Sequence, residues 1–313
     1  MNEQHILEQR TPQAGRLLIG LYPARYRDLH SEDIAATFAE ATEGLNGRAL
    51  LREHLDLASH ALRLRLRIAS TDPAGRMLAG TAPVALALAA GECLSGLLPS
   101  LTALATTSPQ ARPRLFAVEV VLVALVFIPW IVALLLTATG RWRRARPVAV
   151  LAALIDLGVA LVVLGAYDRA PGALLRACAL AALVLLAPPD LVDTGRRGRW
   201  EAVAVALATG VPLAVLMDSR VTLLGWSWYE VPAMVGFWAL LVVSLLLLVH
   251  LSARRPDRLR ALGIALGPAP WLLEYGIGAT HWVVAYFVVL IGGAVAVGGV
   301  VHLVRRMLGA EPA

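Results

Sequence analysis

The sequence contains no lysine and only two cysteines, Cys93 and Cys178. Every basic side chain other than histidine is therefore an arginine, and the formal charge at pH 7 is +6. The two cysteines lie in apolar stretches without a CxxC or Cys/His spacing, which predicts buried thiols rather than a disulfide or a metal site. The abundance of alanine, leucine, valine, glycine and arginine suggests a GC-rich genome.

The motifs of common catalytic and nucleotide-binding sites are also absent. There is no Walker A segment, no GxSxG, no HExxH and no paired Cys/His set, so we expect no enzymatic activity, no metal and no cofactor. The first seventy or so residues are too polar for a cleavable signal peptide. The basic character does not predict nucleic-acid binding, because clustered arginines beside apolar runs are typical of topology determinants and anionic-lipid contacts.

Long apolar runs dominate the rest of the chain, which is 58% hydrophobic with a mean hydropathy of +0.69. Runs of about twenty apolar residues are long enough to cross a bilayer as helices. We therefore expect an all-α fold: a polytopic membrane helix bundle over residues 77–304, a small cytoplasmic helical module over 1–76 and a short cytoplasmic tail over 305–313. The predicted transmembrane helices are 77–98, 115–139, 147–167, 172–192, 201–217, 231–251, 262–278 and 282–303.

The distribution of arginine predicts the orientation of these spans. If the N-terminus is cytoplasmic, seventeen arginines flank the inner ends of the spans and four lie in the outer loops, so the positive-inside rule places both termini in the cytoplasm of a bacterial cell. The inner set is Arg63, Arg65, Arg67, Arg76, Arg141, Arg143, Arg144, Arg146, Arg196, Arg197, Arg199, Arg254, Arg255, Arg258, Arg260, Arg305 and Arg306, and the outer set is Arg112, Arg114, Arg169 and Arg220.

The stretch HALRLRLRIAS, residues 60–70, alternates leucine and arginine as a half-buried strand does. Over residues 48–68, however, Leu51, Leu55, Ala58, Leu62 and Leu66 fall on one helical face, so we expect a helix that leads toward the membrane. Its arginines, and those before the third span, are candidates to set orientation and contact anionic lipid, with a specific partner site as the alternative. These candidates are Arg63, Arg65, Arg67, Arg141, Arg143 and Arg144.

The N-terminal segment has a soluble character. Ser31 is placed to cap a helix whose first turn holds Glu32 and Asp33, and a second helix is expected after Gly44 and Gly47. Such a module is too small to hold an independent active site, so we expect it to pack on the membrane domain or on a partner. The residues that we predict for a partner surface are Tyr22, Tyr26, Arg27 and Phe38.

The segment LYPARYRDLHSEDIAATFAEA, residues 21–41, resembles the opening of a group of uncharacterised multi-pass membrane proteins of GC-rich Gram-positive bacteria. It is also similar to the permease-prefix segments that precede some transporter domains. The resemblance covers about a sixth of the chain and implies a membrane-attached regulatory or transport-associated role. It implies no catalytic residue. The matching positions are Leu21, Tyr22, Pro23, Tyr26, Arg27, His30, Glu32, Asp33 and Ile34, and Ser31 stands where glycine is usual.

Acidic residues inside the predicted spans are the strongest candidates for chemistry, because charge within a bilayer is costly. Asp156 is expected near mid-bilayer, and Glu92 and Glu119 nearer the outer face. One interpretation is an outward-opening acidic cavity for protons or a cation, with Arg176 paired to one of the acids. The alternative is structural, with Asp156 and Glu92 neutral or hydrogen-bonded between helices.

Two functions fit these features. The first is a membrane sensor, regulatory protein or transport-accessory protein, because a small module is joined by a basic helix to a bundle. The alternative is a transporter or permease subunit that moves an ion or small solute by means of the buried acids. Pro268 and Pro270 in the seventh span favour a kinked, broken or re-entrant helix there. The expected partners are the lipid bilayer and either a separate ATPase or a cytoplasmic regulator.

Overall fold

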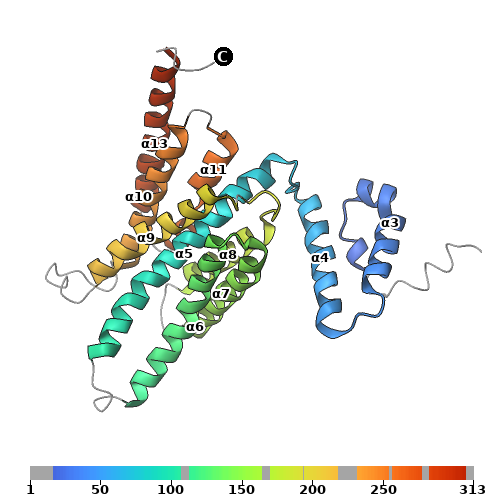
Figure 1. Cartoon of the computed structure of the whole chain (residues 1–313), viewed down its shortest axis with the longest axis horizontal. Helices are drawn as coiled ribbons and strands as arrows, with labels where there is room; N and C mark the ends of the chain where they lie inside the picture. The colour runs from blue at the N-terminus through green and yellow to red at the C-terminus, as the bar shows by residue number, and fades with distance from the viewer. Residues whose placement is uncertain are drawn as a thin grey trace, which may run out of the picture. The chain divides into compact units, whose positions relative to one another are not determined.

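The computed structural model describes residues 17–106, 113–163, 170–192, 194–217, 231–253, 256–276 and 282–307. Within these ranges all the regular elements longer than one turn are helices, which confirms the all-α prediction (Figure 1). Contacts divide the chain into two compact units, Met1–Gly75 and Arg76–Ala313. Each unit is described by itself.

The first unit contains helices α3 (Ala24–Thr42) and α4 (Gly47–Arg65). The prediction that Ser31 caps the first helix is wrong, because α3 begins seven residues earlier and Ser31 lies inside it. Pro23 occupies the cap position with φ −56°, and its carbonyl accepts hydrogen bonds from the amides of Tyr26 at 3.0 Å and Arg27 at 2.9 Å. Proline favours this place because its fixed φ suits a helix start and its missing N–H is not needed there.

Helix α4 confirms the helical interpretation of the leucine–arginine alternation, but it ends earlier than the pattern predicts. Arg67 adopts a left-handed conformation with φ 54°. The amide of Ile68 then donates to the carbonyl of Arg63 at 2.8 Å, and the amide of Arg67 donates to that of Leu64 at 3.2 Å. These two bonds form a Schellman motif with arginine where glycine is usual. The helix therefore stops at Arg65.

The second unit begins within α5 (Pro73–Thr106) and continues, over the residues that the structure describes, through eight further helices. Among these described residues, three helices are long and apolar enough to cross a membrane, over Pro73–Leu97, Trp142–Val162 and Arg196–Leu216, and four shorter apolar helices accompany them. These lengths indicate membrane association, while the count of eight spans stays a prediction. The further helices are α6 (Pro113–Ala138), α7 (Trp142–Val163), α8 (Ala170–Leu186), α9 (Arg196–Met217), α10 (Val231–Leu251), α11 (Arg258–Leu266), α12 (Ala269–Gly276) and α13 (Trp282–Met307).

Helix α5 runs through the middle of this unit in Figure 1, and its glycines approach α6, α9 and α11. Residues 84–91 are all buried, so α5 is covered on every side at this level. Glycines permit the close approach of neighbouring helices. A Cβ on Gly91 would lie 2.7 Å from the Ala206 carbonyl oxygen of α9, and a Cβ on Gly210 would lie 2.6 Å from the carbonyl oxygen of Gly91. Such small-residue contacts are typical of helices packed within membranes.

Two predicted spans differ from the structure. The seventh span, 262–278, is not one helix: it is divided into α11 and α12 at Gly267 and Pro268, as a broken helix would be. The fourth span, 172–192, ends as helix α8 at Leu186, and residues 187–192 form a turn. Proline explains the end of α8, because Pro188 and Pro189 lack the amide hydrogen that a continuing helix requires.

Candidate functional site

A charged cluster joins α5, α8 and α12. Nη1 of Arg176 lies 2.8 Å from Oε1 of Glu92 and 3.0 Å from Oε2 of Glu274. The predicted pairing of Arg176 with an acid is therefore confirmed, and it involves two acids. The three side chains are 18%, 28% and 16% exposed, respectively, so water screens their charges only partly.

Trp271 completes the surroundings of Glu92. Its Nε1 donates to Oε2 of Glu92 at 3.0 Å, and the residue is only 1% exposed. Both carboxylate oxygens of Glu92 are thus bonded, one by a guanidinium and one by an indole. The close approach of α8 and α12 depends on Gly172, where a Cβ would overlap the carbonyl oxygen of Glu274.

Asp156 lies on α7 and accepts a hydrogen bond from Nε1 of Trp130 on α6 at 3.0 Å. Trp130 is 1% exposed, so this bond is shielded from water. The two strongest acid candidates from the sequence, Asp156 and Glu92, are therefore each hydrogen-bonded to a buried tryptophan.

Other predicted acids are less informative. Glu119 lies on α6, but its side chain is outside what the structure describes. Across the described ranges, no group of three or more His, Cys, Asp or Glu residues is placed to hold a metal ion.

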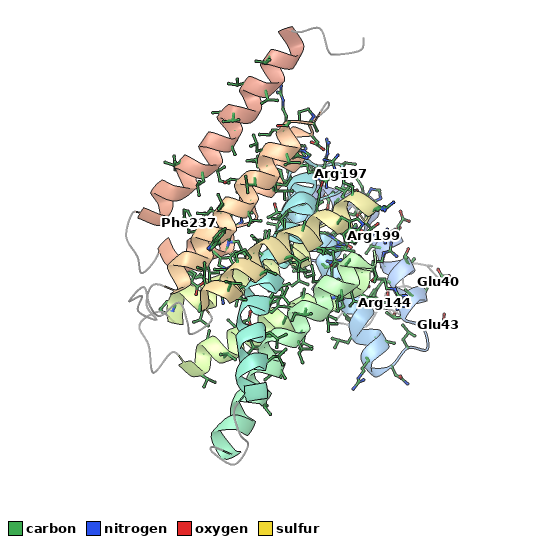
Figure 2. The ribbon with its side chains drawn as sticks, turned by 60° about the vertical axis from the view of Figure 1, so that its left-hand side comes forward. Glu40, Glu43, Arg144, Arg197, Arg199 and Phe237 are labelled. Carbon is green, nitrogen blue, oxygen red and sulfur yellow. The ribbon has the colours of Figure 1, made fainter. Side chains whose placement is uncertain are left out.

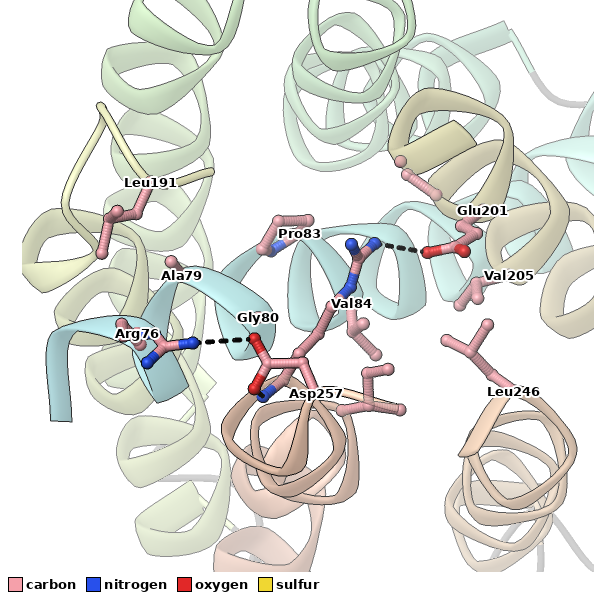
Figure 3. Close-up of a pocket in the computed structure, with 14 residues that line it drawn as sticks. Arg76, Ala79, Gly80, Pro83, Val84, Leu191, Glu201, Val205, Leu246 and Asp257 are labelled. Carbon is pink, nitrogen blue, oxygen red and sulfur yellow. Dashed lines mark hydrogen bonds and ion pairs between the residues drawn. The ribbon is translucent and has the colours of Figure 1, made fainter. Parts of the chain in front are cut away.

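A second charged cluster lies at the other end of α5. Arg76 pairs with Asp257 at 3.1 Å, and Glu201 on α9 pairs with Arg260 on α11 at 2.7 Å and with Arg197 at 2.8 Å. Figure 3 shows the first two of these pairs on either side of a pocket of about 240 Å³. The interior of the pocket is apolar, with Pro83, Val84, Leu191, Val205, Leu246 and Ile264 among its lining residues.

Asp257 positions this second cluster because it caps α11. Its carboxylate accepts hydrogen bonds from the amides of Leu259 at 2.9 Å and Arg260 at 3.4 Å. Burial alone raises the pKa of Asp257, but these amides and the guanidinium of Arg76 lower it more, so the net pKa lies below its usual value. The carboxylate therefore stays charged at neutral pH.

The second cluster was not predicted from the sequence, because Arg76, Arg197 and Arg260 were interpreted only as signals of membrane topology. Two local patterns were available. Glu201 follows Arg197 by four positions, which is the spacing of a helical ion pair. Asp257 directly precedes a helix, which is the preferred place for an N-cap.

The remaining candidate arginines lie at helix ends. Arg141, Arg143 and Arg144 are exposed and line a pocket of about 390 Å³ at the start of α7. In the first unit, Arg65 and Arg67 are exposed and Arg63 is half-buried.

The predicted partner surface divides into buried and half-buried residues. Tyr22 and Phe38 are 2% and 4% exposed, so they belong to the core of the first unit, and Tyr26 and Arg27 are half-buried. Tyr22 stacks on Tyr26 with ring centroids 5.6 Å apart, and burial is the main reason that its pKa rises to about 12. A groove of about 310 Å³ between α3 and α4 is lined by Tyr22, Tyr26, Phe38 and His60 together with Asp33, Glu53 and Asp56.

The comparisons with known proteins give no further guide. No protein-family model matches the chain, and neither a curated protein nor a solved structure matches it.

Proposed function

We propose that this chain is a polytopic membrane protein of the regulatory or transport-accessory class, and that the cluster of Glu92, Arg176 and Glu274 binds a proton or a cation as its signal. The observation on which the proposal rests is that one guanidinium serves two carboxylates. A purely structural ion pair needs only one acid for each arginine. The resemblance of residues 21–41 to the openings of membrane-attached proteins supports the same class.

The charge balance of the cluster supports binding. Two carboxylates that share one guanidinium repel each other within an apolar bundle, so uptake of a proton or a cation lowers the free energy of the cluster. Titratable groups that share one site change protonation as a set rather than singly.

The broken helix gives such a change a route through the bundle. Glu274 and Trp271 lie on α12, whereas Asp257 and Arg260 lie at the start of α11. A change in the pairing of Arg176 therefore acts on α12. Helix α12 directly follows α11, and α11 begins at the second cluster. In this proposal, the small helical module that precedes α5 carries the output signal of the protein.

The experiment compares pH-dependent amide exchange of the full chain in lipid nanodiscs with that of Glu92→Gln and Glu274→Gln variants. We expect the amide protection factors in α11 and α12, which correct for the intrinsic pH dependence of exchange, to change between pH 8 and pH 5 in the native chain and to lose that dependence in both variants. Asp190→Asn is the matched control, because Asp190 is an exposed acid in the turn after α8. Equal pH dependence in all four proteins would contradict the proposal.

A transporter is the second candidate, favoured by the interruption between α11 and α12 at Gly267 and Pro268. Discontinuous helices beside charged residues are typical of transport sites near the middle of the bilayer. Proteoliposomes loaded with a pH-sensitive dye test this candidate. Proton or cation flux that disappears in Glu92→Gln would favour transport. Exchange that depends on pH without flux would favour the regulatory class.

The partner is tested separately by purification from native membranes in mild detergent, with mass spectrometry of the proteins that co-purify. A stoichiometric ATPase would make the chain a permease component, because the sequence holds no nucleotide site of its own. A cytoplasmic regulator would support the regulatory class.

A further inference from the structure

The pocket of about 240 Å³ lies among the starts of α5, α9 and α11 and the end of α10. Protein interiors are close-packed, and voids larger than a water molecule are few. The neighbouring part of the same helices follows this rule, because a Cβ on Gly91 of α5 would lie 2.7 Å from the carbonyl oxygen of Ala206 on α9. The pocket is therefore a local feature of the bundle and does not reflect loose packing of α5 against α9 throughout.

The interior of this pocket suits an apolar ligand. Figure 3 shows Val84 of α5, Val205 of α9 and Leu246 of α10 directed toward one another across it. Ala79 and Ala202 line it with side chains of a single carbon, which leaves the space between the helices unfilled. A hollow with apolar walls and a few polar groups is typical of small-molecule sites.

The polar part of the pocket consists of two ion pairs, Arg76 with Asp257 and Arg260 with Glu201. The carboxylate oxygens of Asp257 accept hydrogen bonds from Arg76 and from two backbone amides of α11. Those of Glu201 accept from Arg260 and Arg197. Every carboxylate oxygen of the two acids is thus already bonded within the protein, so a cationic ligand would have to displace one of these bonds.

The guanidinium of Arg76 has donors left for a ligand. A guanidinium carries five N–H groups. Among the described residues Arg76 donates one hydrogen bond, from Nη2 to Asp257 at 3.1 Å, and its side chain is 50% exposed. Guanidinium groups bind carboxylates through short, charge-assisted hydrogen bonds. The polar part of the pocket therefore favours an anionic group over a cationic one.

The order of these groups along the helices matches an amphipathic ligand. Helices α5 and α9 are both candidate membrane spans, and the pocket is lined by their first turns, within residues 76–84 and 198–205. Arg197 and Arg199 lie at the same charged start of α9 (Figure 2). On both helices the charged lining residue precedes the apolar ones. A polar head therefore fits where the spans begin, with an apolar chain directed toward their middle.

We propose that this pocket binds a fatty acid, with its carboxylate on Arg76 and its chain against Val84, Val205 and Leu246. The pocket of about 240 Å³ is smaller than the roughly 300–1,000 Å³ of sites that hold drug-sized ligands, so it suits one acyl chain rather than the two of a phospholipid. This inference does not depend on the function proposed for the Glu92 cluster.

The experiment is photolabelling of the full chain in phosphatidylcholine nanodiscs. The probe is dodecanoate with a diazirine at the end of its chain, and mass spectrometry locates the labelled residues. Unlabelled dodecanoate, dodecanol and dodecyltrimethylammonium then compete with the probe at pH 8 and at equal amounts per lipid. These three competitors share one chain and differ in the charge of the head, so they separate recognition of the head from that of the chain.

Two variants make the same separation in the protein. Arg76→Gln removes the guanidinium, and Val205→Phe places a larger side chain in the apolar interior. The matched controls are Arg258→Gln and Val211→Phe. Arg258 is exposed on α11 and Val211 is exposed on α9, and neither lines the pocket.

We expect the label on the lining residues of α5, α9 and α10, and we expect dodecanoate to compete about tenfold more strongly than dodecyltrimethylammonium. Arg76→Gln should weaken competition by dodecanoate about tenfold, the effect of one lost hydrogen bond to a charged group, and leave competition by dodecanol unchanged. Val205→Phe should weaken competition by both, because it occupies the place of the chain. Each control should change competition by less than about threefold.

Three results would overturn the proposal. The first is a label that lies outside the pocket, or one that dodecyltrimethylammonium displaces as well as dodecanoate does. The second is a loss in Arg258→Gln as large as that in Arg76→Gln, which would show a general effect of positive charge. The third is unchanged competition in Arg76→Gln. The half-exposed position of Arg76 is expected to tolerate substitution, so it tests the site even if Val205→Phe fails to fold.

Discussion

Replacement of Arg176 by glutamine tests the charged cluster most directly. The variant removes the guanidinium whose Nη1 lies 2.8 Å from Oε1 of Glu92 and 3.0 Å from Oε2 of Glu274. The two partly buried carboxylates then remain together without the guanidinium that they shared. Removal of one partner from a buried ion pair costs about 3–5 kcal/mol of the free energy of unfolding. Each of the three side chains is less than a third exposed, so solvent screening reduces this figure only modestly.

The two cysteines supply an assay. Cys178 is exposed, so the prediction of a buried thiol is wrong for this residue, whereas Cys93 is buried directly beside Glu92 on α5. In a Cys178→Ser background, a thiol-reactive dye labels only Cys93, so labelling during heating reports the opening of the helix that holds the cluster. We expect Arg176→Gln to lower the labelling midpoint by roughly 6–20 °C.

Two further variants decide whether the loss comes from uncompensated charge. Adding Glu92→Gln and Glu274→Gln to Arg176→Gln removes the stranded carboxylates, so the triple variant should recover most of the lost stability. Arg197→Gln is the matched control, because that arginine is 62% exposed and its ion pair with Glu201 contributes little to the free energy of unfolding. A triple variant as unstable as Arg176→Gln, or an unchanged midpoint in Arg176→Gln, would refute the reasoning.

Three other predictions concern packing, backbone strain and pH. A Cβ on Gly263 would overlap the carbonyl oxygen of Met77, so Gly263→Ala should destabilise the second unit by about 1–3 kcal/mol, whereas Gly292→Ala, where nothing lies within 4 Å, should stabilise it by about 0.5–1 kcal/mol in the same labelling assay. Arg67→Gly should stabilise α4 by about 1 kcal/mol because it relieves the left-handed φ, and slower amide exchange in α4 would show this. Burial first, and then Arg63, lowers the pKa of His60, so the unfolded state binds its proton at a higher pH than the folded state. The first unit should therefore lose stability as pH falls below about 6.5, measured as smaller amide protection factors in α3 and α4, and His60→Gln should abolish this contribution.

The sequence predicted α4 correctly because a helical pattern of apolar residues over a long segment outweighed a short alternating pattern within it. Residues 60–70 alternate like a strand, yet α4 follows the longer helical pattern. The ends were predicted less well, because they depend on single backbone conformations. Pro23 starts α3 before Ser31, and Arg67 takes a left-handed conformation that the sequence gives no reason to expect of an arginine.

The candidate site was predictable only in part. The positions of Glu92 and Arg176 along their predicted spans suggested that the two side chains lie close together, and they do form an ion pair. Trp271 was not predictable as a partner of Glu92, because the two residues are 179 positions apart. Their contact depends on how α12 packs between other helices, which hydropathy does not encode.

Helix α5 and the α11–α12 segment connect the two charged clusters, and this connection has a measurable consequence. Arg76 and Glu92 are sixteen positions apart on α5, about 24 Å along its axis. Residues so far apart and without a common partner normally show additive effects, within about 0.3–0.5 kcal/mol. If the segment transmits the state of one cluster to the other, Arg176→Gln and Arg260→Gln should deviate from additivity by more than that in the thiol-labelling assay. The deviation should also change when Pro268→Ala alters the break between the helices. Additive effects would show two independent ion-pair sites, and protonation at Glu92 would then have no route to the pocket beside Arg76.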